Sequence, residues 1–139
     1  MGRMSLLPDA KSYLLDTHTF LWAAHEPERL GKEARRILED ITSQLYLSAV
    51  SAYEVTNKYR NGKLDEYRFV VDNYTEVARK LGTTELPVTL AHAYQAGQMQ
   101  WEYRDPFDRI LAAQAALENL TLITHGAAFQ NHPWFETIW

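Results

Sequence analysis

Four carboxylates in this chain have the types and spacing of a site for a divalent cation. Asp105 and Asp108 lie three residues apart at the start of an apolar run that we expect to be helical, so they project from nearly the same side of that helix. Asp16 directly follows a short apolar segment, and Glu54 lies within a longer one. If these side chains converge, their oxygens provide the hard ligands that Mg²⁺ prefers.

Each of these carboxylates, taken singly, also has a structural explanation. Asp105 followed by Pro106 is a favourable helix start, because Asp caps exposed N–H groups and Pro at the first helical position loses no hydrogen bond. Asp108 would lie in the first turn, where the helix dipole favours a negative charge. Asp16 could cap the helix that follows it, and Glu54 could be a solvated helix residue. The cation site therefore depends on whether the four side chains meet.

Apolar periodicity and turn residues predict short strands that alternate with helices. The expected strands cover residues 13–15, 45–47 and 121–124, with an extended piece at 85–88 and a last edge strand at 136–139. Pro87 confines its segment to the end or edge of a sheet. The expected helices cover residues 17–24, 31–41, the segment from Ser48 or Ser51 to Asn61, 69–81, 89–99 and the run that begins at Asp105.

This order of elements implies right-handed crossovers between parallel strands and helices on both faces of the sheet. We therefore predict an α/β fold, a three-layer α/β/α domain with a central, mainly parallel sheet of four to five strands. Residues 1–11 are predicted to be an N-terminal extension, and residues 12–139 the domain.

The predicted topology gives a reason for the carboxylates to meet. In open parallel sheets, functional groups gather beyond the carboxyl ends of the strands. Asp16 directly follows the first strand, and the helix that begins at Asp105 starts at the same end of the sheet. Glu54 lies in the helix after the second strand and is close enough to reach back. Carboxylates directed at one point repel one another unless protons or cations are present, so stability alone would not gather them.

Composition places the chain among globular domains. Of its 139 residues, 46% are hydrophobic and 23% are charged, and no apolar stretch approaches the length of a membrane span. The first residues lack a basic-then-apolar signal pattern, so we expect a cytoplasmic location. The absence of cysteine excludes disulfides and thiolate metal sites.

The charge pattern limits how nucleic acid could bind. The net charge of −4 argues against a general electrostatic affinity for nucleic acid, although a local basic rim beside an acidic site remains compatible with it. Lys58, Arg60 and Lys63 surround a predicted helix end and are either such a rim or a solvated turn. The five histidines never form a zinc-type pair at helical spacing.

Five segments carry a resemblance to a known family. They are LLDTHTFLW (14–22), LSAVSAYEV (47–55), NGKL (61–64), RDPFDRILAAQA (104–115) and LTLIT (120–124). In this order they resemble the PIN-domain ribonucleases, and specifically the VapC-type toxins of bacterial type II toxin–antitoxin pairs, over almost the whole chain from Tyr13. The resemblance implies a PIN-like version of the predicted α/β/α fold.

The resemblance also implies an activity and its partners. It implies an endoribonuclease that depends on Mg²⁺ or Mn²⁺ and cleaves RNA with a metal-activated water. The implied metal site uses Asp16, Glu54 and Asp108, with Asp105 as an additional member. Single-stranded or looped RNA is the expected substrate, because bases must be splayed to be read. A homodimer and a VapB-type antitoxin, whose tail blocks the active cleft, are implied as well.

One position departs from the family pattern. Family members usually carry an acidic residue shortly after the last core strand, and this chain has Gly126 there. Asp105 could compensate for the missing carboxylate, or His125 could contribute a nitrogen. The alternative is a PIN-like module that keeps antitoxin binding but is catalytically impaired.

Overall fold

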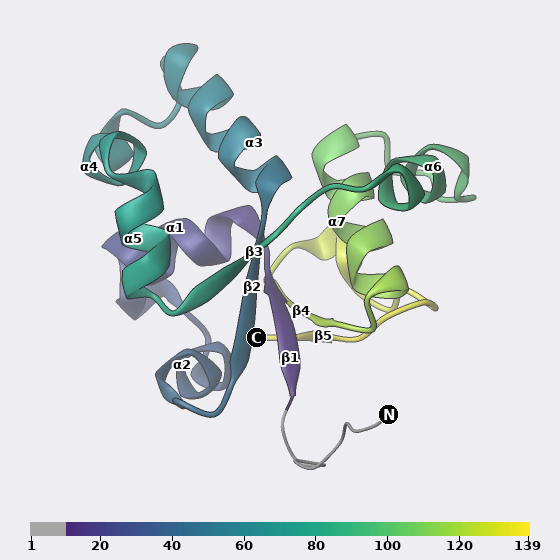
Figure 1. The fold of residues 1–139 in the computed structure, drawn as a ribbon, viewed down its shortest axis with the longest axis horizontal. Coiled ribbons are helices and arrows are strands. Elements are labelled where there is room, and N and C mark those ends of the chain that lie inside the picture. The colour runs from purple at the N-terminus through teal and green to yellow at the C-terminus, as the bar shows by residue number, and fades with distance from the viewer. Residues whose placement is uncertain (1–10) are drawn as a thin grey trace.

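The centre of the fold is a five-stranded sheet in the order β3-β2-β1-β4-β5, in which every neighbouring pair of strands is parallel (Figure 1). The structure is a computed structural model that describes residues 11–139, so the predicted N-terminal extension lies outside the described residues except for Lys11. The strands are β1 (Ser12–Leu15), β2 (Gln44–Ser48), β3 (Thr83–Leu86), β4 (Thr121–Ile123) and β5 (Thr137–Ile138).

Helices cover both faces of this sheet. They are α1 (Thr17–His25), α2 (Lys32–Glu39), α3 (Ala49–Arg60), α4 (Arg68–Asp72), α5 (Tyr74–Lys80), α6 (Leu90–Gln98) and α7 (Pro106–Leu117), with short 3-10 turns η2 (Pro27–Arg29), η3 (Asp65–Tyr67) and η4 (Ala127–Phe129). In Figure 1, α1, α2, α4 and α5 lie on one side of the sheet, and α6 and α7 lie on the other. The predicted three-layer α/β/α domain is therefore confirmed. Within residues 11–139, no helix combines the length and apolar character needed to cross a membrane.

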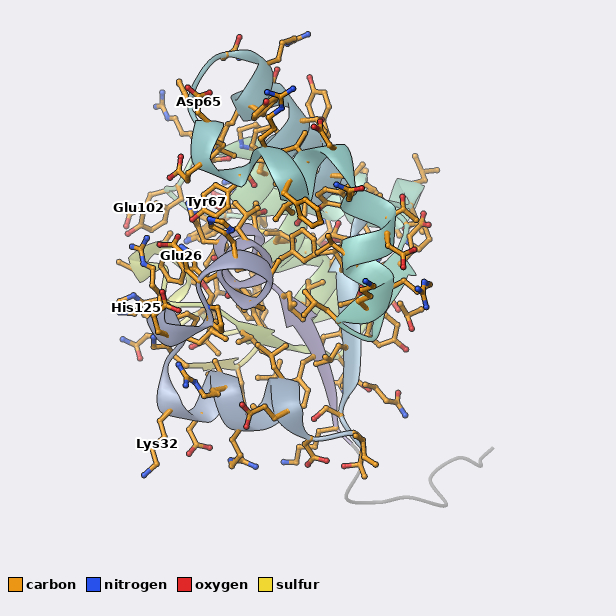
Figure 2. All side chains as sticks on the ribbon, turned by 90° about the vertical axis from the view of Figure 1, so that its left-hand side faces the viewer. Glu26, Lys32, Asp65, Tyr67, Glu102 and His125 are labelled. Atoms are coloured by element: carbon orange, nitrogen blue, oxygen red, sulfur yellow. The ribbon has the colours of Figure 1, made fainter. Side chains whose placement is uncertain are left out.

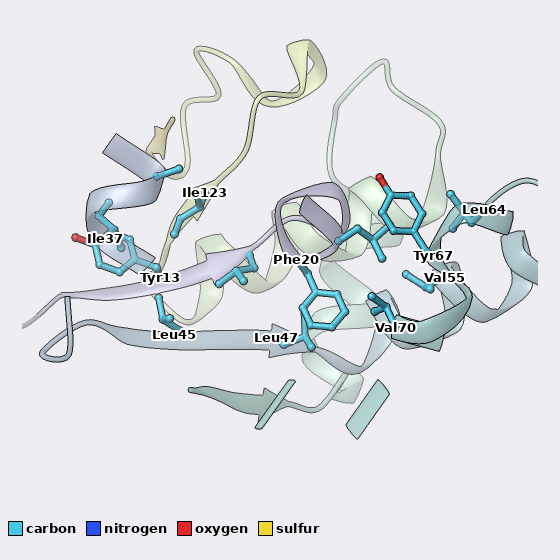
Figure 3. Packing of buried hydrophobic residues seen from close by; sticks show 13 residues of the cluster. Tyr13, Phe20, Ile37, Leu45, Leu47, Val55, Leu64, Tyr67, Val70 and Ile123 are labelled. Atoms are coloured by element: carbon cyan, nitrogen blue, oxygen red, sulfur yellow. The ribbon is translucent and has the colours of Figure 1, made fainter. Parts of the chain in front are cut away.

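Alternate residues of β1 divide the core between the two faces of the sheet. Leu15 packs with Phe20 in the cluster shown in Figure 3, whereas Leu14 packs with Leu111 and Leu122 on the opposite face. All five side chains are buried, and each contributes about 1.5–3 kcal/mol relative to an exposed position. Because β1 is held from both sides, the residue that follows it, Asp16, has a fixed place.

Side-chain caps start the helices that carry the remaining carboxylates. The Oγ of Ser48 accepts a hydrogen bond from the backbone N of Val50 at 3.0 Å, so Ser48 rather than Ser51 caps α3. The Oδ1 of Asp105 accepts from the backbone N of Phe107 at 2.8 Å and caps α7. The predicted capping role of Asp105 is thus confirmed.

The predicted helix over 69–81 is wrong, because the chain breaks at Asn73 into α4 and α5. The backbone N of Asn73 and its side-chain Nδ2 both donate to the carbonyl of Phe69, at 3.0 and 2.9 Å. An Asn side chain competes in this way with helical hydrogen bonding.

Two further boundaries differ from those predicted. The helix expected at 31–41 ends at Glu39, because the carboxylate of Asp40 accepts from both the backbone N and the Oγ1 of Thr42, at 2.9 and 2.8 Å. The extended piece expected at 85–88 lies earlier, at Thr83–Leu86, and ends before Pro87 on an edge strand.

Candidate active site

Asp16 lies at the carboxyl end of β1 and is held by two threonines. Its Oδ1 accepts from the backbone N of Thr17 at 2.7 Å, and its Oδ2 accepts from the Oγ1 of Thr124 at 2.7 Å. Thr124 follows β4, the parallel neighbour of β1, so the ends of both strands converge on one carboxylate. Asp16 caps α1 as well, which means that its structural and functional explanations are compatible.

Glu54 reaches the same place from α3, as the sequence predicts. Its side chain is buried, and its Oε1 accepts from the Oγ1 of Thr17 at 2.7 Å. Thr17 therefore joins the two carboxylates, with its backbone N on Asp16 and its hydroxyl on Glu54. The hydroxyl of Ser51 lies 3.1 Å from the same Thr17 oxygen and extends this buried polar group.

Asp108 comes to the cluster from the first turn of α7. Burial and the negative charges of Asp105, Asp16 and Glu54 together raise its pKa to about 7, while Lys58 acts in the opposite direction. These charges can act on Asp108 only because the side chains lie near one another. Asp108 therefore lies near enough to Asp16 and Glu54 for their charges to affect it, without a direct contact between these side chains among those described.

Asp105 has a more peripheral place than the other three. It is exposed, and its Oδ1 is engaged at the start of α7 by the backbone N of Phe107 and, at 3.4 Å, by that of Asp108. It adds negative charge to the cluster, while its hydrogen bonds orient the turn that carries Asp108.

Lys58 provides a positive charge inside the cluster. Its Nζ lies 2.6 Å from the Oε2 of Glu54, one helical turn away on α3. Burial alone would lower the pKa of Lys58, but the hydrogen bond and charge of Glu54, with the charges of Asp105 and Asp108, raise it. The charges of three carboxylates, Glu54, Asp105 and Asp108, therefore act on one ammonium group.

Burial also affects Asp16. It raises the pKa of this carboxyl, although the hydrogen bonds from Thr124 and Thr17 act in the opposite direction, and the charge of Glu54 adds to the increase. The negative charge of the cluster is therefore only partly compensated by the protein itself.

The segment before α7 is fixed by Arg109. Its guanidinium donates to the carbonyls of Ala96, Met99, Trp101 and Tyr103 at 2.9, 2.6, 2.7 and 2.7 Å. Hydrogen bonds from a charged donor are the stronger kind. They hold the loop between α6 and α7 and so place the turn with Asp105 and Asp108 against the sheet.

The carboxylates have the hard oxygen ligands that a divalent cation prefers, but they do not form a closed shell around one. Among residues 11–139, no three His, Cys, Asp or Glu side chains are grouped closely enough to hold a metal ion in the present arrangement. Thr17, Thr124 and Lys58 occupy the oxygens of Asp16 and Glu54 instead. Mg²⁺ commonly keeps several waters and uses only one or two carboxylates, and a cation would relieve the repulsion that raises the pKa of Asp108.

Gly126, the position that departs from the family pattern, lies beside Asp16. Its backbone N donates to the Oγ1 of Thr124 at 2.9 Å, and that hydroxyl in turn donates to Asp16. Its φ of −71° is accessible to any L residue. A Cβ atom there would lie 3.2 Å from the Oγ1 of Thr124 and 3.3 Å from the Cδ2 of Phe129, so a side chain would need a small shift of its neighbours.

A hollow of about 240 Å³ beside Asp16 also includes Gly126 and His125 in its lining. Two larger hollows, of about 460 and 400 Å³, are lined by none of the four carboxylates. Of the four carboxylates, Asp16 alone lines the smaller hollow.

Sequence reasoning missed the direct partners of the carboxylates. Lys58, which the sequence assigns with Arg60 and Lys63 either to a basic rim or to a solvated turn, pairs with Glu54, and Arg60 donates to the Oδ1 of Asn57 at 2.6 Å. The four-residue spacing of Glu54 and Lys58 on one helix could have indicated this pair. No comparable pattern marks the two threonines, because their roles depend on contacts across the fold.

The model of the PIN domain family matches residues 13–134, and the chain belongs to this family. A sequence comparison with curated proteins finds no match.

Several solved structures share the fold. VapBC2 from Rickettsia felis, bound to a DNA fragment from its promoter, is similar with a TM-score of 0.67 and 16% identity over 91% of this chain and 97% of that one. DNA-bound VapBC from Salmonella typhimurium is similar with a TM-score of 0.65 and 17% identity, over 92% of this chain and 97% of that one. A toxin–antitoxin complex from Klebsiella pneumoniae is similar with a TM-score of 0.57 and 20% identity, over 91% of this chain and 96% of that one.

Asp108→Asn is expected to stabilise the metal-free protein more strongly at pH 8 than at pH 5. The pKa of Asp108 is about 7 in the folded chain and ordinarily 3.8, so ionisation of this carboxyl costs stability as the pH rises between these values. An amide does not ionise, and the variant should gain about 1–2 kcal/mol at pH 8, less than the full pKa shift implies because solvent screens a partly exposed carboxylate. Urea unfolding in EDTA at both pH values measures the difference.

Asp65→Asn is the matched control, because Asp65 is exposed on η3, outside the cluster (Figure 2). It should leave stability unchanged at both pH values. An equal effect of Asp108→Asn on stability at pH 5 and pH 8 would contradict the raised pKa of Asp108.

Proposed function

We propose that this chain is a metal-dependent endoribonuclease, the VapC-type toxin of a toxin–antitoxin module. The observation that carries the proposal is the gathering of Asp16, Glu54 and Asp108 from three elements at one end of a parallel sheet, with the pKa of Asp108 raised to about 7 by burial and by its acidic neighbours. Membership of the PIN domain family supports it, since PIN domains are generally nucleases.

In this proposal Asp16, Glu54 and Asp108 hold Mg²⁺ or Mn²⁺, and Asp105 is an outer member of the site. When bound, the cation would supply activation of water and neutralisation of charge at the scissile phosphate. Thr17 and Thr124 keep the carboxylate of Asp16 in one orientation.

Two residues prepare the remainder of the site. Asp105 caps α7 and orients the turn that presents Asp108. Lys58 compensates part of the negative charge on Glu54 while no cation is present, and its side chain, one third exposed, can move aside. The site can therefore exist in the folded chain before the cation arrives.

The proposed substrate is single-stranded or looped RNA. The net charge of −4 gives the chain no general attraction for nucleic acid, so phosphates would be held at the cation site. Bases in a single strand are free to be splayed and contacted individually, whereas those of a duplex are not. A cytoplasmic location follows from this proposal and stays a prediction.

The proposed partner is a VapB-type antitoxin. The similar solved proteins from Rickettsia felis and Salmonella typhimurium are VapBC complexes, and that from Klebsiella pneumoniae is a toxin–antitoxin complex. An Arg-bearing antitoxin tail would pair with the acidic cluster, because guanidinium binds carboxylates bidentately. The exposed Phe69 and the hollow of about 400 Å³ beside Tyr74 and Ala78 offer apolar surface for its helix.

A homodimer of the chain is proposed as well.

Gly126 favours a second candidate function. A carboxylate is missing beside Asp16 at the position where the family usually has one, which would weaken cation binding. The chain would then be a PIN-like module that binds the antitoxin but cleaves RNA poorly. Cleavage by the purified chain, freed of its antitoxin, separates the two functions.

Asp16→Asn and Asp108→Asn are expected to lower Mn²⁺-dependent cleavage of single-stranded RNA by more than about 100-fold, because the loss of a metal ligand should exceed the 10- to 100-fold effect of an outer partner. Asp105→Asn should be milder, since Asn retains the helix cap. Initial rates on a labelled oligoribonucleotide measure these effects, with folding checked by circular dichroism.

Asp65→Asn serves again as the control and should cleave like the wild type. If the wild type cleaves and Asp16→Asn or Asp108→Asn is equally active, the proposed site is wrong. If no divalent cation elicits cleavage by the wild type, the binding module is the better description.

Gly126→Asp is expected to tighten Mn²⁺ binding and to increase RNA cleavage. The new carboxylate would lie beside Asp16, and the φ of −71° at this position needs no glycine. Gly126→Ala is the matched control, because it meets the same close contacts with Thr124 and Phe129 without adding a charge. Metal titration and cleavage assays on both variants make the comparison. Equal affinity and activity of Gly126→Asp and Gly126→Ala would show that residue 126 has no part in the site.

A further inference from the structure

The hollow of about 240 Å³ beside Asp16 has an unusual lining for the edge of an acidic site. It is formed by Asp16, His18, Thr19, Trp22, His125 and Gly126. Three of these six residues carry planar rings. We propose that this hollow binds one nucleobase of single-stranded RNA by stacking, next to the phosphate held at the carboxylate cluster. The proposal rests on the proposed function and deepens it, because it assigns a base-binding position to the same site.

The rings form one connected group with the C-terminal tryptophan. His125 stacks on Trp139 with ring centroids 5.2 Å apart and planes 10° from parallel. Trp139 meets Trp22 edge to face at 5.7 Å, and His18 meets Trp22 at 5.6 Å. Segments from α1, from the loop after β4 and from the end of the chain thus build a single aromatic wall.

Residues before α2 hold this aromatic wall in place. Trp139 packs so closely against Gly31 that a Cβ atom at Gly31 would lie 2.5 Å from its ring, and the guanidinium of Arg29 covers the ring of Trp22 at 4.3 Å. A wall that is already held in place loses little conformational entropy when a ligand stacks on it.

The two histidines of the aromatic wall are accessible to solvent. His18 and His125 are both exposed, although Trp139 stacks on His125. Figure 2 shows His125 on the same side of the molecule as Glu26, the residue that ends α1. Gly126 places no side chain between His125 and Asp16, so the hollow stays open toward the carboxylate.

The size and charge of the hollow select a base over other ligands. A volume of about 240 Å³ is below the range of about 300–1,000 Å³ that is usual for larger ligands. An anionic group here would be repelled by Asp16, whereas a neutral planar base would not. Every base has a face that can stack on a ring, so the position would tolerate different bases.

Binding of two labelled six-nucleotide probes tests the proposal. One is hexaadenylate, and the other is an abasic hexamer with the same ribose and phosphate chain. Fluorescence anisotropy with the wild type in Ca²⁺, with the intactness of each probe checked on a gel, should show tighter binding of hexaadenylate. His125→Ala should weaken that binding roughly five- to tenfold, the lower part of the range for base stacking, and leave the abasic probe unaffected.

Further variants separate stacking from charge and from misfolding. His125→Phe should retain the affinity for hexaadenylate, because Phe offers a ring without a charge. His18→Ala should weaken the same probe selectively, which keeps the test decisive if His125→Ala does not fold. His25→Ala is the matched control, since His25 is an exposed histidine of α1 that packs on Tyr67 instead of lining the hollow.

The outcomes are distinct. The base-binding hollow would be overturned if the wild type bound both probes with equal affinity. It would also be overturned if His125→Ala and His125→Phe lost the same affinity for both probes. Either result would count even if the wild type cleaves RNA. That result would leave an Arg-bearing antitoxin segment as the better occupant of the hollow. A wild type that neither binds nor cleaves RNA with any divalent cation would overturn the proposed function together with this inference.

Discussion

Repulsion among carboxylates is the constraint on which the rest of this site depends. The parallel sheet brings Asp16 and the helices that carry Glu54 and Asp108 to one end, and burial deprives their charges of solvent. The clearest consequence is the pKa of about 7 for Asp108. Lys58 pairs directly with Glu54 alone, and under the proposed function an additional cation would compensate the remaining charge.

The other contacts of the site can be understood as braces against this repulsion. Thr17 links Asp16 to Glu54, and Thr124 ties Asp16 to the neighbouring strand. Arg109 fixes the loop before α7 through four carbonyl groups, and the cap of Asp105 sets the first turn of that helix. The links from Thr17 to Glu54 and from Thr124 to Asp16 join segments that are distant in sequence, so the geometry of the site depends on the whole domain.

Local patterns in the sequence were sufficient for the architecture. The apolar run before Asp16, the caps at Ser48 and Asp105 and the strand near Thr121 all lie close to their predicted positions, because they depend on neighbours in sequence. The break at Asn73 was missed because it coincides with a side-chain hydrogen bond to the carbonyl of Phe69, which apolar periodicity does not show. Topology also predicted that Asp16, Glu54 and Asp108 would meet, but the pairing of Lys58 and the roles of the threonines depend on side-chain contacts that topology does not specify.

The central claim is that the carboxylate cluster is a cation site for which Lys58 competes. Equilibrium Mn²⁺ binding, followed by the electron paramagnetic resonance signal of the free ion, tests it most directly. The wild type should bind Mn²⁺, Asp108→Asn should bind it more weakly, and Lys58→Met should bind it more tightly because Glu54 is then released. A wild type that binds no Mn²⁺ at millimolar concentration, or an Asp108→Asn variant that binds as tightly as the wild type, would contradict the claim.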